Sequence, residues 1–290
     1  MKDAPREISL VADGLTYRGL SWGDPSAPLV FAIHGWLDNA LSFARLAPLM
    51  EGCHFVAIDL SGHGLSSHRS ADASYHIWDE IPQLLKVIDQ LTHEPVAVIG
   101  HSRGAAVAAL LATALGDRCS SLAMLDGMLF RSFENDNGAT LLRDGIAELT
   151  KYSSRPPRIF DAVEDFIKAR SRYGFTRENA EVLVPRALER VDEGWLLRSD
   201  PRLFAASMVK LSDATAAACY ESMDFPVMAI MGADGFFTSE GARDMIARIG
   251  KHAPHFRQID LAGPHHFHLE GDVAGLASIL RETIRERRAA

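Results

Sequence analysis

The pentapeptide Gly100-His101-Ser102-Arg103-Gly104 decides how the rest of the 290-residue chain is interpreted. It follows a short β-rich run, 95–99, and precedes an alanine- and leucine-rich stretch, 105–115, that is typical of a buried helix. A G-x-S-x-G motif between a strand and a helix predicts a sharp turn that exposes the serine. Glycine is expected on both sides because a Cβ atom there would collide with neighbouring chain. We therefore expect Ser102 to be a nucleophile.

Apolar, β-rich runs on both sides of this motif predict a parallel sheet. They lack strict alternation of apolar and polar residues, as expected for strands that are covered on both faces. Between the second and third runs, apolar residues of 77–91 recur with helical spacing, which predicts a βαβ crossover. The predicted fold class is α/β, with a doubly wound and mostly parallel sheet. The six runs are 29–33, 54–58, 95–99, 121–125, 226–231 and 256–261, and a closing helix is expected over 273–288.

The character of the sequence changes between Phe130 and Met223. Charge is dense there, Pro156-Pro157 interrupts the chain, and 159–172 has a helical pattern, but no strand is evident. We interpret residues 129–224 as a helical cap inserted into a core domain formed by 1–128 and 225–290. Such a cap is expected to bring apolar residues over the serine, although we favour ordinary packing for each candidate. The candidates are Phe130, Phe133, Trp195, Phe236 and Phe237.

Composition and charge exclude several classes of protein. Apolar residues make up 47% and charged residues 23%, which is typical of a folded globular protein. The net charge of −8 gives no electrostatic reason to bind nucleic acid. The longest uncharged, mostly apolar run, 105–115, is short of the roughly 18 residues needed to span a bilayer. We expect no nucleic-acid partner and no membrane span.

Cysteine usage and the N-terminus favour a cytoplasmic location. Cys53, Cys119 and Cys219 are odd in number and have no C-x-x-C spacing, so neither a disulfide framework nor a zinc site is predicted. No apolar stretch follows the charged residues of the N-terminal decapeptide, so it does not resemble a secretory signal.

Further motifs occur in the order typical of the α/β-hydrolase fold. His34-Gly35-Trp36 and the segment 59–66, which includes Gly-His-Gly, precede the Ser102 motif as they do in that superfamily. At a finer level the sequence resembles the serine hydrolase-like proteins, and this resemblance implies hydrolase chemistry without a particular substrate. It rests on HGWLDNA at 34–40, GHGLSSH at 62–68, MLDG at 124–127 and PHHFH at 264–268.

A serine nucleophile needs a histidine that removes its proton and a carboxylate that orients the histidine. α/β-hydrolases carry this histidine after the last strand, where the present chain has His265, His266 and His268. The resemblance implies that His265 is the base, because relatives with a G-H-x-x-H-L-E ending use the first histidine. The other two are expected in pocket or structural roles. No metal is expected, because two of the histidines are adjacent and no carboxylate or cysteine ligand pattern accompanies them.

Two residues are candidates for the acid that orients the histidine. Asp126 follows the run 121–125, and Asp234 follows the run 226–231. Asp234 stands one residue before the place of the usual acid, which is Gly235 here, and a one-residue shift turns a side chain to the other face. The serine hydrolase-like proteins have an aspartate at the position of Asp126. We favour Asp126, keep Asp234 as the alternative, and note that Asp-Gly is also common in simple turns.

Two backbone N–H groups are expected to form an oxyanion hole, those of Trp36 and of Arg103, the residue after the nucleophile. The family's motifs imply structural roles for His34 and Asp59. The Arg103 side chain has three open interpretations: it is solvated, it pairs with a carboxylate of the cap, or it meets an anionic substrate. The stretch 200–203 resembles one in the serine hydrolase-like proteins and suggests an ion pair or a cap-to-core contact.

These observations predict an enzyme that hydrolyses a carboxylic ester of a small molecule through an acyl-enzyme, without a cofactor. The same residues would serve a thioesterase or a C–C bond hydrolase. Epoxide hydrolases and haloalkane dehalogenases are disfavoured because their nucleophile is an aspartate. The alternative from another class is a catalytically silent, ligand-binding homologue, against which the intact Ser102 and His265 argue.

Overall fold

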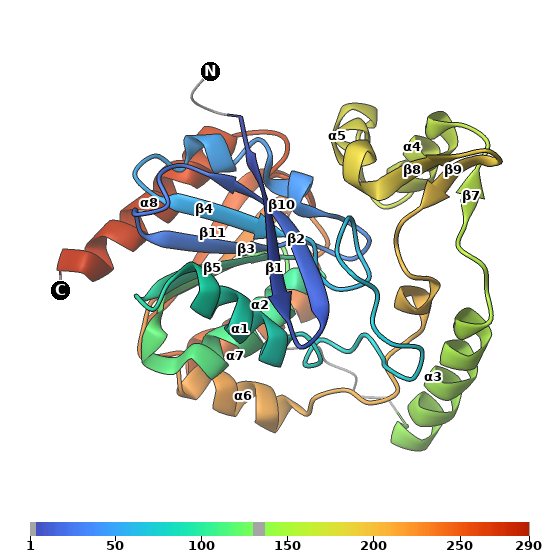
Figure 1. Cartoon of the computed structure of the whole chain (residues 1–290). Coiled ribbons are helices and arrows are strands. Elements are labelled where there is room, and N and C mark those ends of the chain that lie inside the picture. Colours follow the sequence, from blue (N-terminus) through green and yellow to red (C-terminus); the bar gives the residue numbers. More distant parts are fainter. Residues whose placement is uncertain (1–3, 130–136, 290) are drawn as a thin grey trace.

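A computed structural model describes residues 4–129 and 137–289 of the chain. Its centre is an eight-stranded sheet with the order β1-β2-β4-β3-β5-β6-β10-β11 (Figure 1). β2 pairs antiparallel with β1 and β4, and the other neighbours pair parallel. The strands are β1 Arg6–Ala12, β2 Leu15–Trp22, β3 Leu29–Ile33, β4 His54–Ile58, β5 Val96–His101, β6 Cys119–Leu125, β10 Val227–Asp234 and β11 Phe256–Pro264.

The predicted α/β fold with a mostly parallel sheet is confirmed. Each of the six β-rich runs corresponds to a strand, and β3 and β4 have the predicted bounds. Along β3 the side chains alternate between two apolar clusters, with Phe31 and Ile33 in one and Val30 and Ala32 in the other. Both faces of the strand are therefore buried, which explains why the sequence showed no polar alternation.

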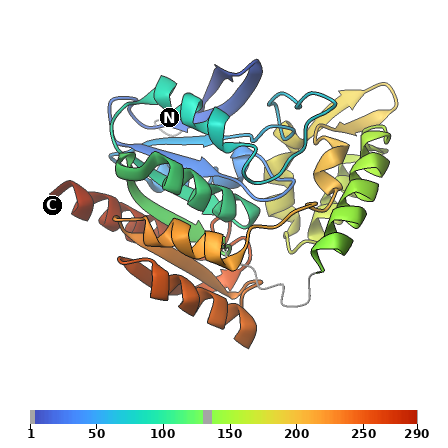
Figure 2. The same cartoon turned by 90° about the horizontal axis from the view of Figure 1, so that it is seen from below.

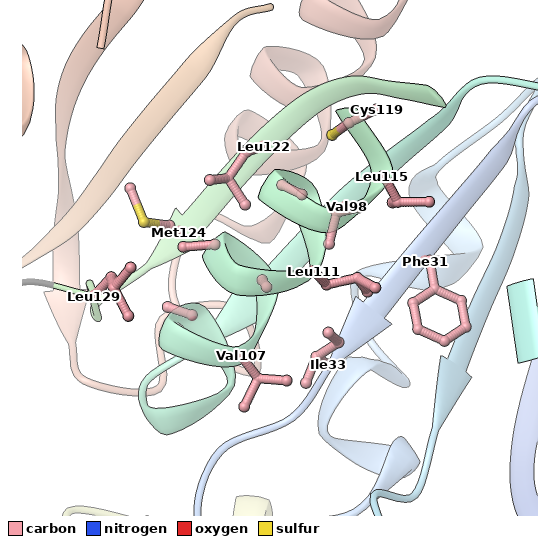
Figure 3. Packing of buried hydrophobic residues seen from close by; sticks show 14 of the residues in the cluster. Phe31, Ile33, Val98, Val107, Leu111, Leu115, Cys119, Leu122, Met124 and Leu129 are labelled. Atoms are coloured by element: carbon pink, nitrogen blue, oxygen red, sulfur yellow. The ribbon is translucent and has the colours of Figure 1, made fainter. Parts of the chain in front are cut away.

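Helices cover both faces of the sheet. On one face, α2 packs Val107 and Leu111 into the apolar cluster that includes Ile33 and Val98 of the strands (Figure 3). Apolar residues of α1, α6 and α7 join the same cluster, whereas those of α8 pack on the opposite face. No helix within 4–129 or 137–289 is long and apolar enough to cross a membrane. The helices are α1 Ile81–Leu91, α2 Arg103–Leu115, α6 Asp213–Glu221, α7 Glu240–His252 and α8 Val273–Ala289.

The helix expected over 77–91 begins later than predicted. α1 starts at Ile81, and Pro82 occupies its first turn. Proline is favoured there because its fixed φ suits a helix, and because a backbone N–H at that position, which proline lacks, would have no acceptor within the helix. The apolar residue Ile77 nevertheless packs against the same cluster as the helix.

Between β6 and β10 the chain leaves the central sheet and returns to it with α6, and we call residues 137–212 the insertion. Figures 1 and 2 show its α3, α4, α5 and β7–β9 beside one end of the sheet. The expectation that it has no strands was wrong: β7, β9 and β8 form a small antiparallel sheet, and the segment 159–172 begins with β7 before α4. Strands of two to four residues are too short for their periodicity to be detected. The elements are α3 Gly138–Ser153, β7 Ile159–Phe160, α4 Val163–Ser171, α5 Arg177–Ala187, β8 Leu188–Val191 and β9 Gly194–Leu197.

Two buried ion pairs join the insertion to the loops that follow β3 and β4. Arg170 of α4 pairs with Asp38, and Arg186 of α5 pairs with Asp59 at 2.9 Å. Removing one partner of a buried pair leaves an uncompensated charge and typically costs about 3–5 kcal/mol. The insertion is therefore fixed to the carboxyl ends of the parallel strands.

Candidate active site

Ser102 lies at the sharp turn between β5 and α2. Its φ of 53° and ψ of −120° are rare for a residue other than glycine. Its N–H donates to the carbonyl of Leu125 at 2.9 Å, which holds the turn. A Cβ atom on Gly100 would lie 2.3 Å from the carbonyl oxygen of Gly104, and one on Gly104 would lie 2.4 Å from that of Ile33. Both flanking positions therefore require glycine, and the Ser102 side chain stays partly exposed.

His265 lies between Ser102 and Asp126 and contacts both. Its Nε2 is 3.0 Å from Ser102 Oγ, and its Nδ1 donates to Asp126 Oδ2 at 2.5 Å. The three residues stand at the carboxyl ends of β5, β11 and β6. The structure thus brings together the residues expected to be nucleophile, base and acid, and we call them the Ser102 row.

The end of β10 and the turn that follows it hold the carboxylate of Asp126. Oδ1 accepts the N–H of Gly232 at 3.1 Å, and Oδ2 accepts the N–H of Phe236 at 2.9 Å. A Cβ atom on Gly235 would lie only 2.4 Å from Oδ1, so the carboxylate occupies the space that a side chain at this position would need. The space beside Gly235, where the usual acid was expected, is thus filled by the carboxylate of Asp126, the residue that follows β6.

Asp234, the alternative acid, is not brought to His265. Its side chain is exposed, and its backbone pairs with Pro264 where β10 and β11 end. Within the described residues, the carboxylate bonded to His265 Nδ1 is that of Asp126. The parity of the strand accounts for this, because a side chain one residue earlier points to the other face.

The environment of His265 keeps its imidazole neutral at pH 7. Burial lowers the pKa of His265, and the hydrogen bond to Asp126 opposes this effect only in part. One face of the ring is stacked on Phe236, with centroids 3.8 Å apart and planes inclined by 15°. A neutral ring with a proton on Nδ1 presents the Nε2 lone pair to Ser102, which is the form that accepts a proton.

Trp36 and Arg103, the expected oxyanion-hole residues, lie in the loop after β3 and at the first position of α2. The first N–H groups of a helix have no acceptor within it and favour negative charge nearby. The Trp36 indole donates to the carbonyl of Leu203 at 2.8 Å, which ties this loop to the insertion. The Arg103 side chain donates to the carbonyl of Tyr75 at 2.5 Å. Pairing with a carboxylate of the cap, one of its three open interpretations, is not found within the described residues.

His34 and Asp59 have the structural contacts expected of them. Nε2 of His34 accepts the N–H of Leu60 at 3.0 Å, so it joins the loops after β3 and β4. The Asp59 carboxylate accepts the N–H groups of Ala40 and Leu65, each at 2.7 Å. Both residues shape the loops around the Ser102 row and do not belong to it.

His101, for which the sequence predicted no role, lies in a buried cluster of histidine rings. Its Nε2 donates to the carbonyl of His265 at 3.0 Å, and its Nδ1 is 3.7 Å from the Asp38 carboxylate. Burial acts to raise the pKa of Asp38, but the Arg170 guanidinium and His101 hold it below its usual range. His101 therefore supports the backbone of His265 through its Nε2, while the Arg170–Asp38 ion pair lies beside its other ring nitrogen. The sequence feature that could have indicated a role for His101 is its position directly before Ser102.

His266 and His268 are buried in the same cluster. Burial lowers the pKa of His266 to about 2 and that of His268 well below its ordinary value. His101, His265 and His266 offer ligand atoms within 4.8 Å of one another. A metal bound there would have to displace a partner of His265, because both of its ring nitrogens already have partners in the Ser102 row. The expectation of a metal-free site therefore stays a prediction.

The candidate pocket residues have different positions. Phe236 stacks on His265, whereas Phe237 packs against the core cluster. Trp195 packs within the insertion, where Arg190 lies 5.4 Å from its ring centroid. Phe130 and Phe133 lie outside the described residues.

Comparisons with known proteins agree with this fold. A family model described as the alpha/beta hydrolase fold matches residues 28–272. The structure of a hypothetical protein from Pseudomonas aeruginosa PAO1 is 34% identical, with a TM-score of 0.86 over 98% of this chain and 99% of that one. A thioesterase domain from the curacin biosynthetic pathway is 23% identical, with a TM-score of 0.82 over 96% and 99% of the two chains. The chain belongs to the α/β-hydrolase fold family.

Within that family the chain is a hydrolase close to the serine hydrolase-like proteins, as its motifs predicted. A serine hydrolase-like protein of Dictyostelium discoideum is 28% identical over 97% of this chain and 82% of that protein.

Proposed function

We propose that the chain is a serine hydrolase that cleaves a carboxylic ester of a small molecule through an acyl-enzyme. The proposal rests on one observation above all, the unbroken row of hydrogen bonds from Asp126 Oδ2 to His265 to Ser102 Oγ. A serine hydroxyl becomes a nucleophile when a neutral histidine accepts its proton and a carboxylate stabilises the imidazolium that forms.

In the proposed first half-reaction, Ser102 Oγ attacks the ester carbonyl and its proton passes to His265 Nε2. The N–H groups of Trp36 and Arg103 stabilise the oxyanion of the tetrahedral intermediate. The C–O bond to the alcohol then breaks, and His265 returns the proton to the alkoxide that leaves. Asp126 accepts hydrogen bonds from two backbone N–H groups and from His265, and it orients the imidazole in both half-reactions.

In the second half-reaction, water takes the place of the alcohol. His265 removes a proton from the water, the hydroxide attacks the acyl carbonyl, and the bond to Ser102 Oγ breaks with return of the proton. We further propose that residues 129–224 act as a cap over this site and that the protein works in the cytoplasm. The same chemistry would cleave a thioester.

The test is turnover of a short 4-nitrophenyl ester by the wild type and Ser102→Ala. We expect the variant to lose at least about 10³-fold in kcat, since removing a triad member abolishes nucleophilic catalysis. Ser120→Ala is the matched control, because Ser120 is partly exposed on β6, near the amino end of the strand and away from the row. Equal activity in Ser102→Ala and the wild type would refute the proposal.

A further inference from the structure

A cavity of about 220 Å³ lies beside Arg103, between loops of the core and the insertion. Trp36 and Arg103, the proposed oxyanion-hole residues, both line it, and Arg103 directly follows Ser102 in the chain. Complete small-molecule pockets usually measure about 300–1,000 Å³. The cavity therefore has the size of a subsite for one part of a substrate.

The walls of this cavity carry positive charge. Its lining includes Arg103 and Arg202 but no aspartate or glutamate among the described residues. His76 also lines the cavity, but burial lowers its pKa, so the ring is neutral at pH 7. The net charge presented to a ligand therefore comes from the two guanidinium groups.

Arg202 is already neutralised by its own surroundings. It forms an ion pair with Asp200 at 2.7 Å and donates to the carbonyls of Arg69, Ser70 and Ala73. This is the ion pair and the cap-to-core contact that the sequence suggested. Its charge and most of its five N–H donors are therefore used in holding the insertion on the core.

Arg103 differs from Arg202 in having no carboxylate within ion-pair distance among the described residues. Its side chain donates to the Tyr75 carbonyl at 2.5 Å, which uses one of its five N–H donors. The acids that act on it over a longer range have other partners: Glu80 accepts from Tyr17 and is paired with Arg69 at 3.6 Å, and Asp79 accepts from Ser74. A partly buried guanidinium without a counterion favours a carboxylate, which its planar fork binds through two hydrogen bonds.

We infer that the cavity beside Arg103 binds a carboxylate group of the substrate, so that the preferred ester is anionic. The inference rests on the proposed function and names its substrate class. Arg103 directly follows Ser102, so its backbone N–H faces the reacting carbonyl. Its side chain binds the carboxylate group and thereby favours an anionic substrate. Apolar groups of the insertion line the cavity beside the two arginines and suit a short carbon chain; they are Leu149, Leu203, Phe204 and Met208.

The test compares the kcat/KM values of matched anionic and neutral esters. An acyl-side pair consists of mono-4-nitrophenyl adipate and its methyl ester, and an alcohol-side pair consists of 4-butyryloxybenzoate and its methyl ester. On one of the two pairs, the wild type is expected to favour the anionic ester by at least about 10-fold, as for a hydrogen bond to a charged group. Arg103→Met is expected to reduce that anionic-to-neutral ratio by a similar factor, and Arg103→Lys to retain part of it.

Because the anionic-to-neutral ratio of kcat/KM is taken within each variant, a loss of activity that affects both esters equally does not change it. Arg118→Met is the matched control, since it removes one positive charge at the amino end of β6, where Arg118 pairs with Asp89. If Arg103→Met does not fold, a fall of the wild-type ratio between 0.05 and 0.5 M KCl decides instead. If the wild type hydrolyses the neutral esters and its anionic-to-neutral ratio of kcat/KM is one or less on both pairs, this inference is overturned and the proposed function stands. If the wild type hydrolyses none of the esters, the proposed function is overturned as well.

Discussion

At the scale of single residues, the account depends on which carboxylate orients His265. Asp126 is buried, has a φ of 41° and receives two backbone N–H bonds besides that of His265. A non-glycine residue with positive φ is uncommon and is retained where the surrounding structure determines it. Asp234 has an exposed side chain. The two aspartates therefore provide a matched pair for mutation.

Asp126→Asn is expected to lower kcat for a 4-nitrophenyl ester by about 10⁴-fold, because the amide leaves the imidazole in the wrong tautomer. Asp234→Asn is expected to stay within about twofold of the wild type, as for most exposed substitutions. Circular dichroism checks that both variants fold. The assignment fails if Asp234→Asn is the more damaging change.

At the scale of elements, the site depends on how the ends of β6 and β10 meet. The Asp126 carboxylate fits against the turn after β10 because position 235 has no side chain. Both strands and both aspartates could be identified from the sequence, since an aspartate follows each of the two apolar runs within three residues. The choice between the aspartates could not be made from the residues alone, because it depends on which side chain enters a space that two separate segments share.

Gly235→Ala tests this contact. Its Cβ atom would lie 2.4 Å from Asp126 Oδ1, so the carboxylate has to move, and a displacement of about 1 Å in a catalytic group can cost 10²-fold in rate. We expect kcat to fall at least about 10-fold, with unfolding still cooperative. Gly241→Ala in α7 is the control, because beyond its own helical turn no atom of the described chain lies within 4 Å of the added Cβ. Equal kcat values for the two variants would show that the position of the carboxylate is not critical.

Other elements were missed for identifiable reasons. The hairpin of β1 and β2 was not predicted, although Asp13-Gly14, both with positive φ, form the type of turn that joins such strands. The small sheet of the insertion has strands too short to show a period. The start of α1 depends on a local residue, Pro82, and the apolar spacing of 77–91 does not indicate where the helix begins.

At the scale of the whole molecule, buried ion pairs join the insertion to loops of the core. Arg170 and Asp38 are 132 positions apart, and Arg186 and Asp59 are 127 apart, so no local pattern relates them. Motif order predicted the fold and the residues that the structure brings together at the site. The buried ion pairs that join the insertion to the core, and the hydrogen bond from His101 to the carbonyl of His265, became visible only in three dimensions.

The most direct test of the central claim is covalent labelling of the folded wild-type protein with a fluorophosphonate probe, followed by peptide mapping. The account predicts a single adduct on Ser102. Its rate should rise with pH to a plateau, because only neutral His265 accepts the serine proton, and the midpoint should lie below about 6.5 because burial lowers the pKa of His265. A folded protein that remains unlabelled, as expected of a silent binding homologue, or an adduct on a residue other than Ser102, would contradict the account.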